Sequence, residues 1–213
     1  LTRQGLVAMN PKDGSVKFSR WFRSRVNESV NAANPVVSGS QVFCSSSYHG
    51  AGSFLLDVGI DCESFNEVWS TYERRKRDRK LKPVLEIHWT TPILHDGHLY
   101  AFTGRNEPDA KFRCVELKTG KIKWNREESW RAYSTKQPKV YGRGSALMAD
   151  GKLFVLGEGG LLGLFEVTPD KPVELARYQV PEFHYPCWAA PILSDKRLYI
   201  RSESYLICFN VSK

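Results

Sequence analysis

Several features that identify common protein classes are missing from this chain of 213 residues. Its five cysteines include no adjacent pair and no C-x-x-C pair, which excludes the usual zinc and redox spacings. An odd number of cysteines also argues against a disulfide framework. Cys114 and Cys208 occupy matching places in a repeat described below, and we expect both to pack in the core. No run of about 18 apolar residues occurs, so the sequence predicts no membrane-spanning helix.

The chain also lacks the motifs of common hydrolases. It has no G-x-S-x-G, no H-E-x-x-H and no convincing pair of carboxylates, which argues against a hydrolase or a glycosidase. Leu1 to Gly5 include neither an initiator methionine nor the layout of a secretory signal, so we expect the chain to be part of a longer protein. With 41% hydrophobic and 12% aromatic residues, the composition is that of a globular body with a substantial core.

A short pattern recurs four times along the chain. It consists of an apolar stretch that begins at a Pro or Ala, a polar turn, and then an aliphatic residue followed by an aromatic one. The aliphatic–aromatic pairs are Val42-Phe43, Leu99-Tyr100, Leu153-Phe154 and Leu198-Tyr199. Recurrence at roughly 50 residues indicates a structural repeat.

One repeat can be divided into four short strands. Residues 90–94 and 99–103 are rich in apolar and β-branched residues and flank the tight turn His95-Asp96-Gly97. Residues 112–117 alternate between apolar and polar, and a second turn leads to a strand that begins at Ile122. Four antiparallel strands in a unit of this size are typical of a β-propeller blade. The sequence therefore predicts an all-β fold, a propeller of four-stranded antiparallel blades.

Counting strands divides the whole of residues 1–213 into about four blades. The predicted ranges are 6–23 for a half blade, 33–72, 88–127 and 143–179 for complete blades, and 188–211 for three strands of another. Open edges of sheets invite aggregation, and propellers close them by pairing terminal strands. We therefore expect this chain to be the C-terminal half of a propeller of seven or eight blades.

The predicted outer strands carry an aromatic residue at a regular place, and we expect these rings to pack between adjacent sheets. They are Phe18, Trp69, Trp124 and Tyr178. The segment from Cys114 to Trp124, Cys-Val-Glu-Leu-Lys-Thr-Gly-Lys-Ile-Lys-Trp, resembles the tryptophan-docking repeat of the PQQ-like, quinoprotein-type propeller family. Residues 7–18 resemble a degraded copy, in which Phe18 replaces the tryptophan. Glu116 or Leu117 stands near the place of the usual Asp.

The resemblance carries expectations about function. The family includes dehydrogenases that use pyrroloquinoline quinone (PQQ), the lipoprotein propeller of the outer-membrane β-barrel assembly machinery, and uncharacterised exported bacterial proteins, which this sequence resembles most. It implies a non-catalytic binding or scaffold module in the bacterial periplasm or cell envelope, with a protein or polysaccharide partner. The alternative is a PQQ-dependent alcohol or sugar dehydrogenase with calcium. The adjacent cysteines that cover the quinone in such enzymes are missing here, so its cofactor ligands would lie mostly outside this segment.

Candidate binding residues precede the first strand of each blade, where they would surround the mouth of the central channel. They are Asn31, His88, Trp89, Arg143 and Trp188. Indoles, an imidazole and a guanidinium at one axis would suit a flat ligand or an anion. The alternative is that these aromatics only pack. His95 and His98 flank a predicted turn, which explains them better than a metal does, and no metal site is predicted.

A basic run between two predicted blades supplies much of the net charge of +8. Its candidate residues for binding an anion or an acidic partner are Arg74, Arg75, Lys76, Arg77, Arg79 and Lys80. A solvated loop is the simpler interpretation, although such clusters also attract phosphates and anionic lipids. Nucleic-acid binding is not favoured, because no aromatic platform is interleaved with the basic residues.

Overall fold

Short antiparallel strands joined by tight turns make up most of the protein. The computed structural model describes residues 1–24, 26–72, 83–129 and 140–212. The first sheet has two strands, β1 (Gly5–Met9) and β2 (Val16–Trp21). The second has four, β3 (Val36–Ser38), β4 (Gln41–Ser46), β5 (Gly52–Val58) and β6 (Phe65–Ser70). A one-turn 3-10 helix, η1 (Tyr48–Gly50), connects β4 to β5.

The remaining three sheets continue the same plan. The third contains β7 (Ile93–His95), β8 (His98–Thr103), β9 (Lys111–Glu116) and β10 (Ile122–Glu127), with the 3-10 turn η2 (Glu107–Asp109) between β8 and β9. The fourth contains β11 (Ser145–Ala149), β12 (Lys152–Leu156), β13 (Leu161–Glu166) and β14 (Glu174–Gln179). The fifth contains β15 (Ile192–Ser194), β16 (Arg197–Arg201) and β17 (Leu206–Asn210).

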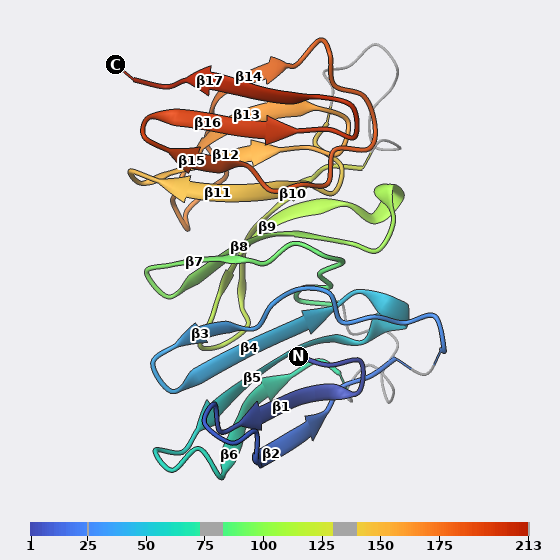
Figure 1. Cartoon of the computed structure of the whole chain (residues 1–213), viewed down its shortest axis with the longest axis vertical. Helices are drawn as coiled ribbons and strands as arrows, with labels where there is room; N and C mark the ends of the chain where they lie inside the picture. Colours follow the sequence, from blue (N-terminus) through green and yellow to red (C-terminus); the bar gives the residue numbers. More distant parts are fainter. Residues whose placement is uncertain (25, 73–82, 130–139, 213) are drawn as a thin grey trace.

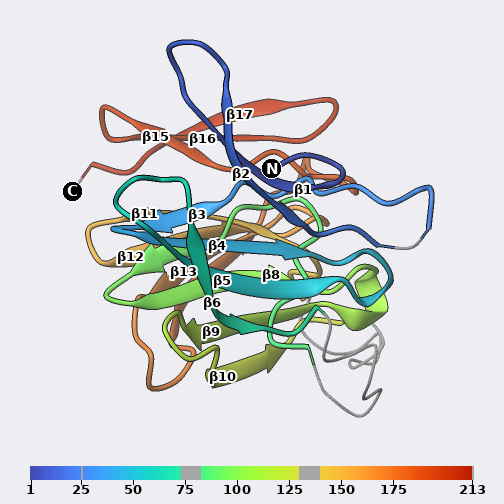
Figure 2. The same cartoon turned by 90° about the horizontal axis from the view of Figure 1, so that it is seen from below.

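The second, third and fourth sheets follow one another along the long axis of the molecule, with β1–β2 packed beside the second sheet at one end and β15–β17 beside the fourth at the other (Figure 1). Each sheet pairs its strands in chain order, and the view from below shows the successive sheets turned relative to one another (Figure 2). The predicted all-β fold, with antiparallel blades of a propeller, is confirmed. No helix in the described part of the chain is long and apolar enough to cross a membrane.

Local turn chemistry explains where the first two strands of the third and fourth sheets end. Asp96 and Gly97 both have positive φ, 43° and 72°, as do Asp150 and Gly151, at 47° and 67°. A two-residue hairpin loop in the left-handed region matches the twist of the flanking strands, and Asp-Gly sequences adopt it readily. The motif at His95 is therefore a hairpin turn, as the sequence analysis predicted. No three His, Cys, Asp or Glu side chains gather into a possible metal site among the described residues.

The core lies in layers between neighbouring sheets. One layer joins Phe43 and Leu55 of the second sheet to Leu99 and Val115 of the third. The next layer joins rings of the third and fourth sheets, with Phe112 and Phe165 at a centroid distance of 5.5 Å. The alternating apolar residues of each inner strand thus bury both faces of the central sheets, because another sheet covers each face.

The packing leaves no room for a side chain at one glycine of the fourth sheet. A Cβ atom at Gly163 would lie 2.0 Å from the hydroxyl oxygen of Tyr141, whose ring is fully buried. That hydroxyl donates a hydrogen bond of 2.7 Å to Glu174 Oε1. Gly163 is therefore required by a close approach and not by backbone conformation.

The four outer-strand aromatics each contact the following sheet. Trp69 Nε1 donates to the carbonyl of Leu117 at 2.9 Å, and Trp124 Nε1 donates to the carbonyl of Thr168, also at 2.9 Å. The other two make ring contacts, Phe18 with Phe65 at 4.9 Å and Tyr178 with Phe209 at 6.1 Å. Tyr178 remains 50% exposed, whereas Trp124 is 8% exposed.

One prediction about the cysteines is wrong. Cys114 is buried as expected, but Cys208 on β17 is exposed. The residues along β17 alternate between exposed and half-buried, and no fourth strand covers its outer edge within the part of the chain that the structure describes. The same sequence position is thus buried only where a further sheet packs against it.

Candidate functional site

Four of the five predicted mouth residues come together on the loops that lead into the first strands of the third, fourth and fifth sheets. The ring centroids of His88 and Trp89 lie 5.1 Å apart, and those of Trp89 and Trp188 lie 5.9 Å apart. The guanidinium carbon of Arg143 lies 4.9 Å from the Trp89 ring centroid, within the range of a cation–π contact. We call these four residues the axial cluster.

The fifth residue, Asn31, has a different place. Its amide donates hydrogen bonds of 2.9 Å to the carbonyls of Thr2 and Phe22. Asn31 therefore fastens the first residues of the chain to the end of β2. The structure does not bring it to the axial cluster through any contact among the described residues.

Arg143 is buried and carries a partner that the sequence analysis missed. Its Nη2 lies 2.9 Å from Oε2 of Glu158, a carboxylate with no exposed surface. Glu158 Oε1 also accepts the backbone N–H of Arg143 at 2.9 Å. A buried carboxylate that accepts several hydrogen bonds and faces a guanidinium neutralises the arginine. The predicted use of Arg143 as an anion ligand thus competes with an ion pair already in place.

The hydrogen bonds fix the tautomer of His88. A guanidinium has donors only, so the contact of 2.8 Å between Arg143 Nη1 and His88 Nδ1 makes Nδ1 the acceptor. The neutral ring then carries its proton on Nε2, which donates to the hydroxyl of Tyr48 at 3.0 Å. His88 therefore links Arg143 to the loop after β4.

The network continues outward to a second pair of an arginine and a histidine. Arg143 Nη1 donates to the carbonyl of Arg105 at 2.8 Å, and Arg105 Nη1 donates to His49 Nε2 at 3.1 Å. The Arg105 guanidinium carbon lies 5.3 Å from the Tyr48 ring centroid. The sequence analysis did not identify Tyr48, Arg105 or Glu158. Each of the three stands two residues after the second strand of its sheet. An alignment of the repeats would therefore have shown that they occupy equivalent positions.

Two aromatic side chains beside the axial cluster remain open to solvent. Trp188 is 48% exposed and Tyr185 is 49% exposed, and their ring centroids lie 6.0 Å apart. A cavity of about 320 Å³ lies beside these rings, and its wall includes Trp89, Trp188, Thr91 and Ser145. The Trp89 indole N–H is buried and has no hydrogen-bond acceptor within the described residues. The mouth therefore offers ring surface together with an unused donor.

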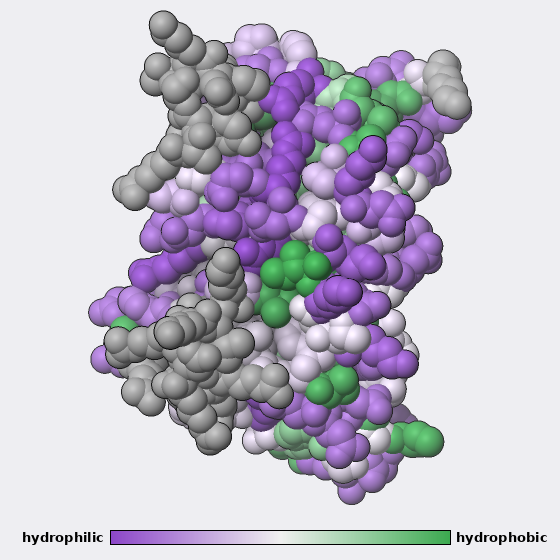
Figure 3. All heavy atoms as spheres, turned by 180° about the vertical axis from the view of Figure 1, so that it is seen from behind, coloured by the Kyte–Doolittle hydropathy of each residue, from purple (hydrophilic) through white to green (hydrophobic). Residues whose placement is uncertain are grey.

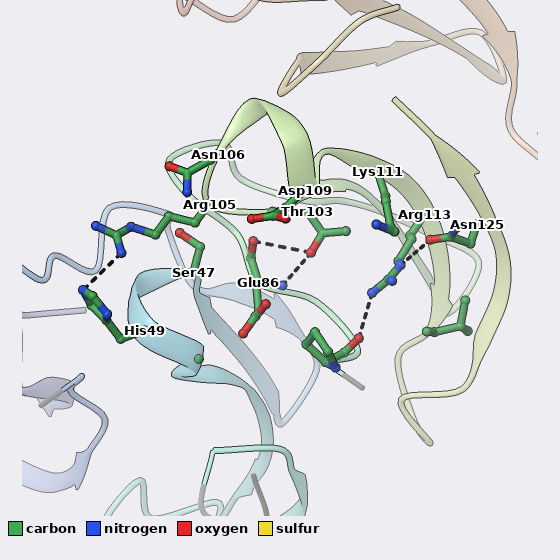
Figure 4. Close-up of a pocket in the computed structure, with 14 residues that line it drawn as sticks. Ser47, His49, Glu86, Thr103, Arg105, Asn106, Asp109, Lys111, Arg113 and Asn125 are labelled. Atoms are coloured by element: carbon green, nitrogen blue, oxygen red, sulfur yellow. Dashed lines mark hydrogen bonds between the residues drawn. The ribbon is translucent and has the colours of Figure 1, made fainter. Parts of the chain in front are cut away.

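A larger polar cleft lies next to this network, between the second and third sheets (Figure 4). Its volume is about 820 Å³. Its polar walls are formed by Ser47, His49, Glu86, Thr103, Arg105, Asn106, Asp109, Lys111, Arg113 and Asn125. His49 and Arg105 belong to both the network and the cleft, so the two features form one continuous loop face of the propeller.

A second buried ionic group lies outside this face. Glu128 has no exposed surface, its Oε1 lies 2.9 Å from Arg126 Nε, and its Oε2 accepts the backbone N–H of Tyr141 at 3.0 Å. Burial raises the pKa of Glu128 to about 7, against the opposing effects of Arg126 and the Tyr141 N–H. Arg126 also contacts Glu174 at 2.6 Å. We assign this group to the packing of the third and fourth sheets.

The surface seen from behind Figure 1 is mostly hydrophilic, with separate small hydrophobic areas (Figure 3). The predicted basic residues Arg74, Arg75, Lys76, Arg77, Arg79 and Lys80 lie outside the described residues. They remain predictions from the sequence.

Comparison with known proteins identifies the fold only. No family model matches the chain, and no curated protein sequence matches it. Among solved structures, BamB from Moraxella catarrhalis superposes with a TM-score of 0.62 at 15% identity, over 98% of this chain and 52% of BamB. The chain thus has the fold of a β-propeller. The computationally designed protein Ika8 gives a TM-score of 0.55 at 10% identity, over 99% of this chain and 56% of Ika8. The chain therefore spans about half the length of both proteins.

Proposed function

We propose that this chain belongs to a non-catalytic binding propeller whose loop face holds a partner protein at the mouth of the channel. The observation that carries the proposal is the axial cluster with its open edge. Trp188 and Tyr185 are about half exposed, and Trp188 packs against Trp89, which in turn contacts His88 and Arg143. Trp, Tyr and Arg are the residues most enriched among the few that dominate protein interfaces.

The support beneath the exposed rings also favours binding. Arg143 is locked by Glu158 and by His88, so Trp89 is held in one orientation behind Trp188. A rigid aromatic surface loses little conformational entropy when a partner covers it, and this raises the affinity per unit of buried area.

The family resemblance suggests where such a module works. It includes the lipoprotein propeller of the outer-membrane assembly machinery, and the fold likeness to BamB agrees with that resemblance. We therefore extend the proposal to a periplasmic or cell-envelope location and to a protein partner.

Photo-crosslinking tests this proposal. A photoreactive amino acid is placed at position 188 or 185 of the full chain, and at position 171 in the β13–β14 loop as an exposed control. After irradiation in cells, we expect a discrete adduct from positions 188 and 185, identifiable by mass spectrometry, and none from position 171. Equal adducts at all three positions, or none at 188, would contradict the proposal.

The dehydrogenase alternative rests on the resemblance alone. PQQ in that family comes with a calcium ion, and the ligands of both would lie mostly outside this segment. Calorimetric titration of the full chain with PQQ and calcium, followed by a dye-reduction assay with alcohols and aldoses, tests the alternative. Stoichiometric binding with turnover would establish it and would overturn a purely non-catalytic function.

A further inference from the structure

We infer that the polar cleft between the second and third sheets is a separate binding site for a neutral oligosaccharide. The cleft is distinct from the axial cluster, although both open on the loop face. Its volume of about 820 Å³ falls within the range of roughly 300–1,000 Å³ found for small-molecule sites. The inference rests on three properties of its walls, namely an unsatisfied buried hydroxyl, an alternation of charge, and a set of planar polar groups of which Arg113 is held rigidly.

The buried hydroxyl belongs to Ser47. The residue is 3% exposed, lies on the wall of the cleft, and its Oγ finds no hydrogen-bond partner within the part of the chain that the structure describes. A buried polar group that lacks a partner costs about 1–3 kcal/mol. Other buried serines near it are satisfied: Ser45 and Ser53 both donate to the carbonyl of Leu85. Ser47 is thus an exception that a ligand hydroxyl would complete.

The distribution of charge argues against a ligand with a single net charge. Figure 4 shows the carboxylates of Glu86 and Asp109 between Arg105 on one side and Lys111 and Arg113 on the other. An anion drawn to either basic side would meet the acidic centre, and a cation at the centre would meet basic groups at both sides. Attraction and repulsion of similar size leave little net gain at these separations. A neutral ligand with many hydrogen-bonding groups avoids this conflict.

The planar groups match the hydroxyls of a sugar. Each sugar hydroxyl both donates and accepts, so it needs neighbours of both kinds. Asn106 and Asp109 sit on the loop after β8, and their side chains make no hydrogen bonds with other described residues. Carboxylate, amide and guanidinium groups can each engage two adjacent hydroxyls at once. Ile122 and Pro83 add apolar surface for the C–H face of a sugar ring.

Arg113 gives the cleft a rigid wall. The side chain is largely buried, its Nε donates to Asn125 Oδ1 at 2.6 Å, and its Nη1 donates to the carbonyls of Pro83 and Val84 at 2.7 Å. Burial lowers the pKa of Arg113, although the nearby Glu86 and Glu127 oppose that effect. A guanidinium fixed by three hydrogen bonds needs no further ordering when a ligand arrives.

Calorimetric titration of the full chain tests the inference with defined probes. The neutral probes are maltotriose, cellotriose and tri-N-acetylchitotriose, supplemented by an array of neutral glycans. The charged probes are citrate, spermidine and the zwitterion glycylglycine. We expect at least one neutral oligosaccharide to bind saturably and the charged probes not to bind at the same concentrations. Binding of charged probes alone, or of no neutral glycan by the folded protein, would overturn the inference.

Variants locate the binding in the cleft. Asp109→Ala and Ser47→Ala should each weaken oligosaccharide binding about tenfold, which corresponds to 1.4 kcal/mol. Asp109 is exposed, so its replacement leaves the core intact, and Asp170→Ala in the exposed β13–β14 loop is the matched control with unchanged binding. Unchanged binding in both cleft variants would overturn the inference. Crosslinking at position 188 should persist in Asp109→Ala, so failure of this site and failure of the proposed function are distinguishable.

Discussion

Replacing Trp124 should reveal how much the outer-strand aromatics contribute to holding neighbouring sheets together. Trp124→Phe removes the indole N–H that donates to the Thr168 carbonyl at 2.9 Å, a bond worth about 1 kcal/mol net. It also shrinks a ring that is 8% exposed and packed at 5.2 Å against Phe112, which adds about 1–2 kcal/mol. We therefore expect a loss of about 2–3 kcal/mol in the free energy of unfolding. Trp124→Ala should cost about 3–5 kcal/mol.

Tyr178 provides the matched control within the same repeat position. Its ring is 50% exposed, and its hydroxyl makes no hydrogen bond with other described residues, so Tyr178→Phe should change stability by less than about 0.5 kcal/mol. Equilibrium unfolding in urea, followed by far-UV circular dichroism, avoids a readout that depends on the mutated indole. Equal losses for Trp124→Phe and Tyr178→Phe would refute the view that the indole bridge joins the sheets.

Three further predictions concern the packing and the buried charges. Gly163→Ala should cost about 1–3 kcal/mol because its Cβ would lie 2.0 Å from a buried hydroxyl, whereas Gly159→Ala, with open space around it, should be close to neutral in the same urea assay. The pKa of Glu128 is raised from 4.5 to about 7, so the folded state binds this proton more tightly than the unfolded state does. The contribution of protonated Glu128 to the free energy of unfolding is therefore full below pH 4.5 and is lost as the pH rises through about 7. Glu128→Gln should remove this pH dependence, worth roughly 3 kcal/mol at most, and an unchanged profile from pH 4 to 8 would contradict the assignment. Glu158→Gln should lower the free energy of unfolding by about 3–5 kcal/mol, because it removes the carboxylate that neutralises the buried Arg143 guanidinium. Glu166→Gln on the surface is the control and should leave stability unchanged. Equal thermal unfolding of the two variants would contradict the importance of the ion pair.

Much of the fold could be predicted because the relevant signals are local. The Asp-Gly pair at Asp96 specifies a hairpin loop, and the alternation in residues 112–117 specifies a strand with one face inward. The structure places β9 at Lys111–Glu116, close to that range. The degree of burial was harder to predict. Tyr178 and Cys208 follow the repeat pattern yet remain exposed, because burial depends on what packs beyond the sheet and not on the strand itself.

The candidate site could be predicted only in part for a different reason. The proximity of His88, Trp89, Arg143 and Trp188 could be predicted from their positions just before the first strand of each sheet, because equivalent loops of a propeller converge on one axis. Aligning the repeats could have identified Glu158 as the equivalent of Tyr48 and Arg105. Its ion pair with Arg143 could not be predicted, because that contact depends on side-chain direction within two different loops. Asn31 shows the opposite error: it has the right position, but its amide is used by the backbone of the first residues.

The most direct test of the account is the affinity of the crosslinked partner for variants of the mouth. Once position 188 has identified that partner, its dissociation constant is measured for Trp188→Ala and for Tyr205→Ala, an aromatic residue of similar exposure in the β16–β17 turn. We expect Trp188→Ala to weaken binding at least about 30-fold, the scale of a residue that dominates an interface, and Tyr205→Ala to leave it unchanged. Equal affinities for both variants and the unmodified chain would contradict the proposal that the axial mouth is the binding site.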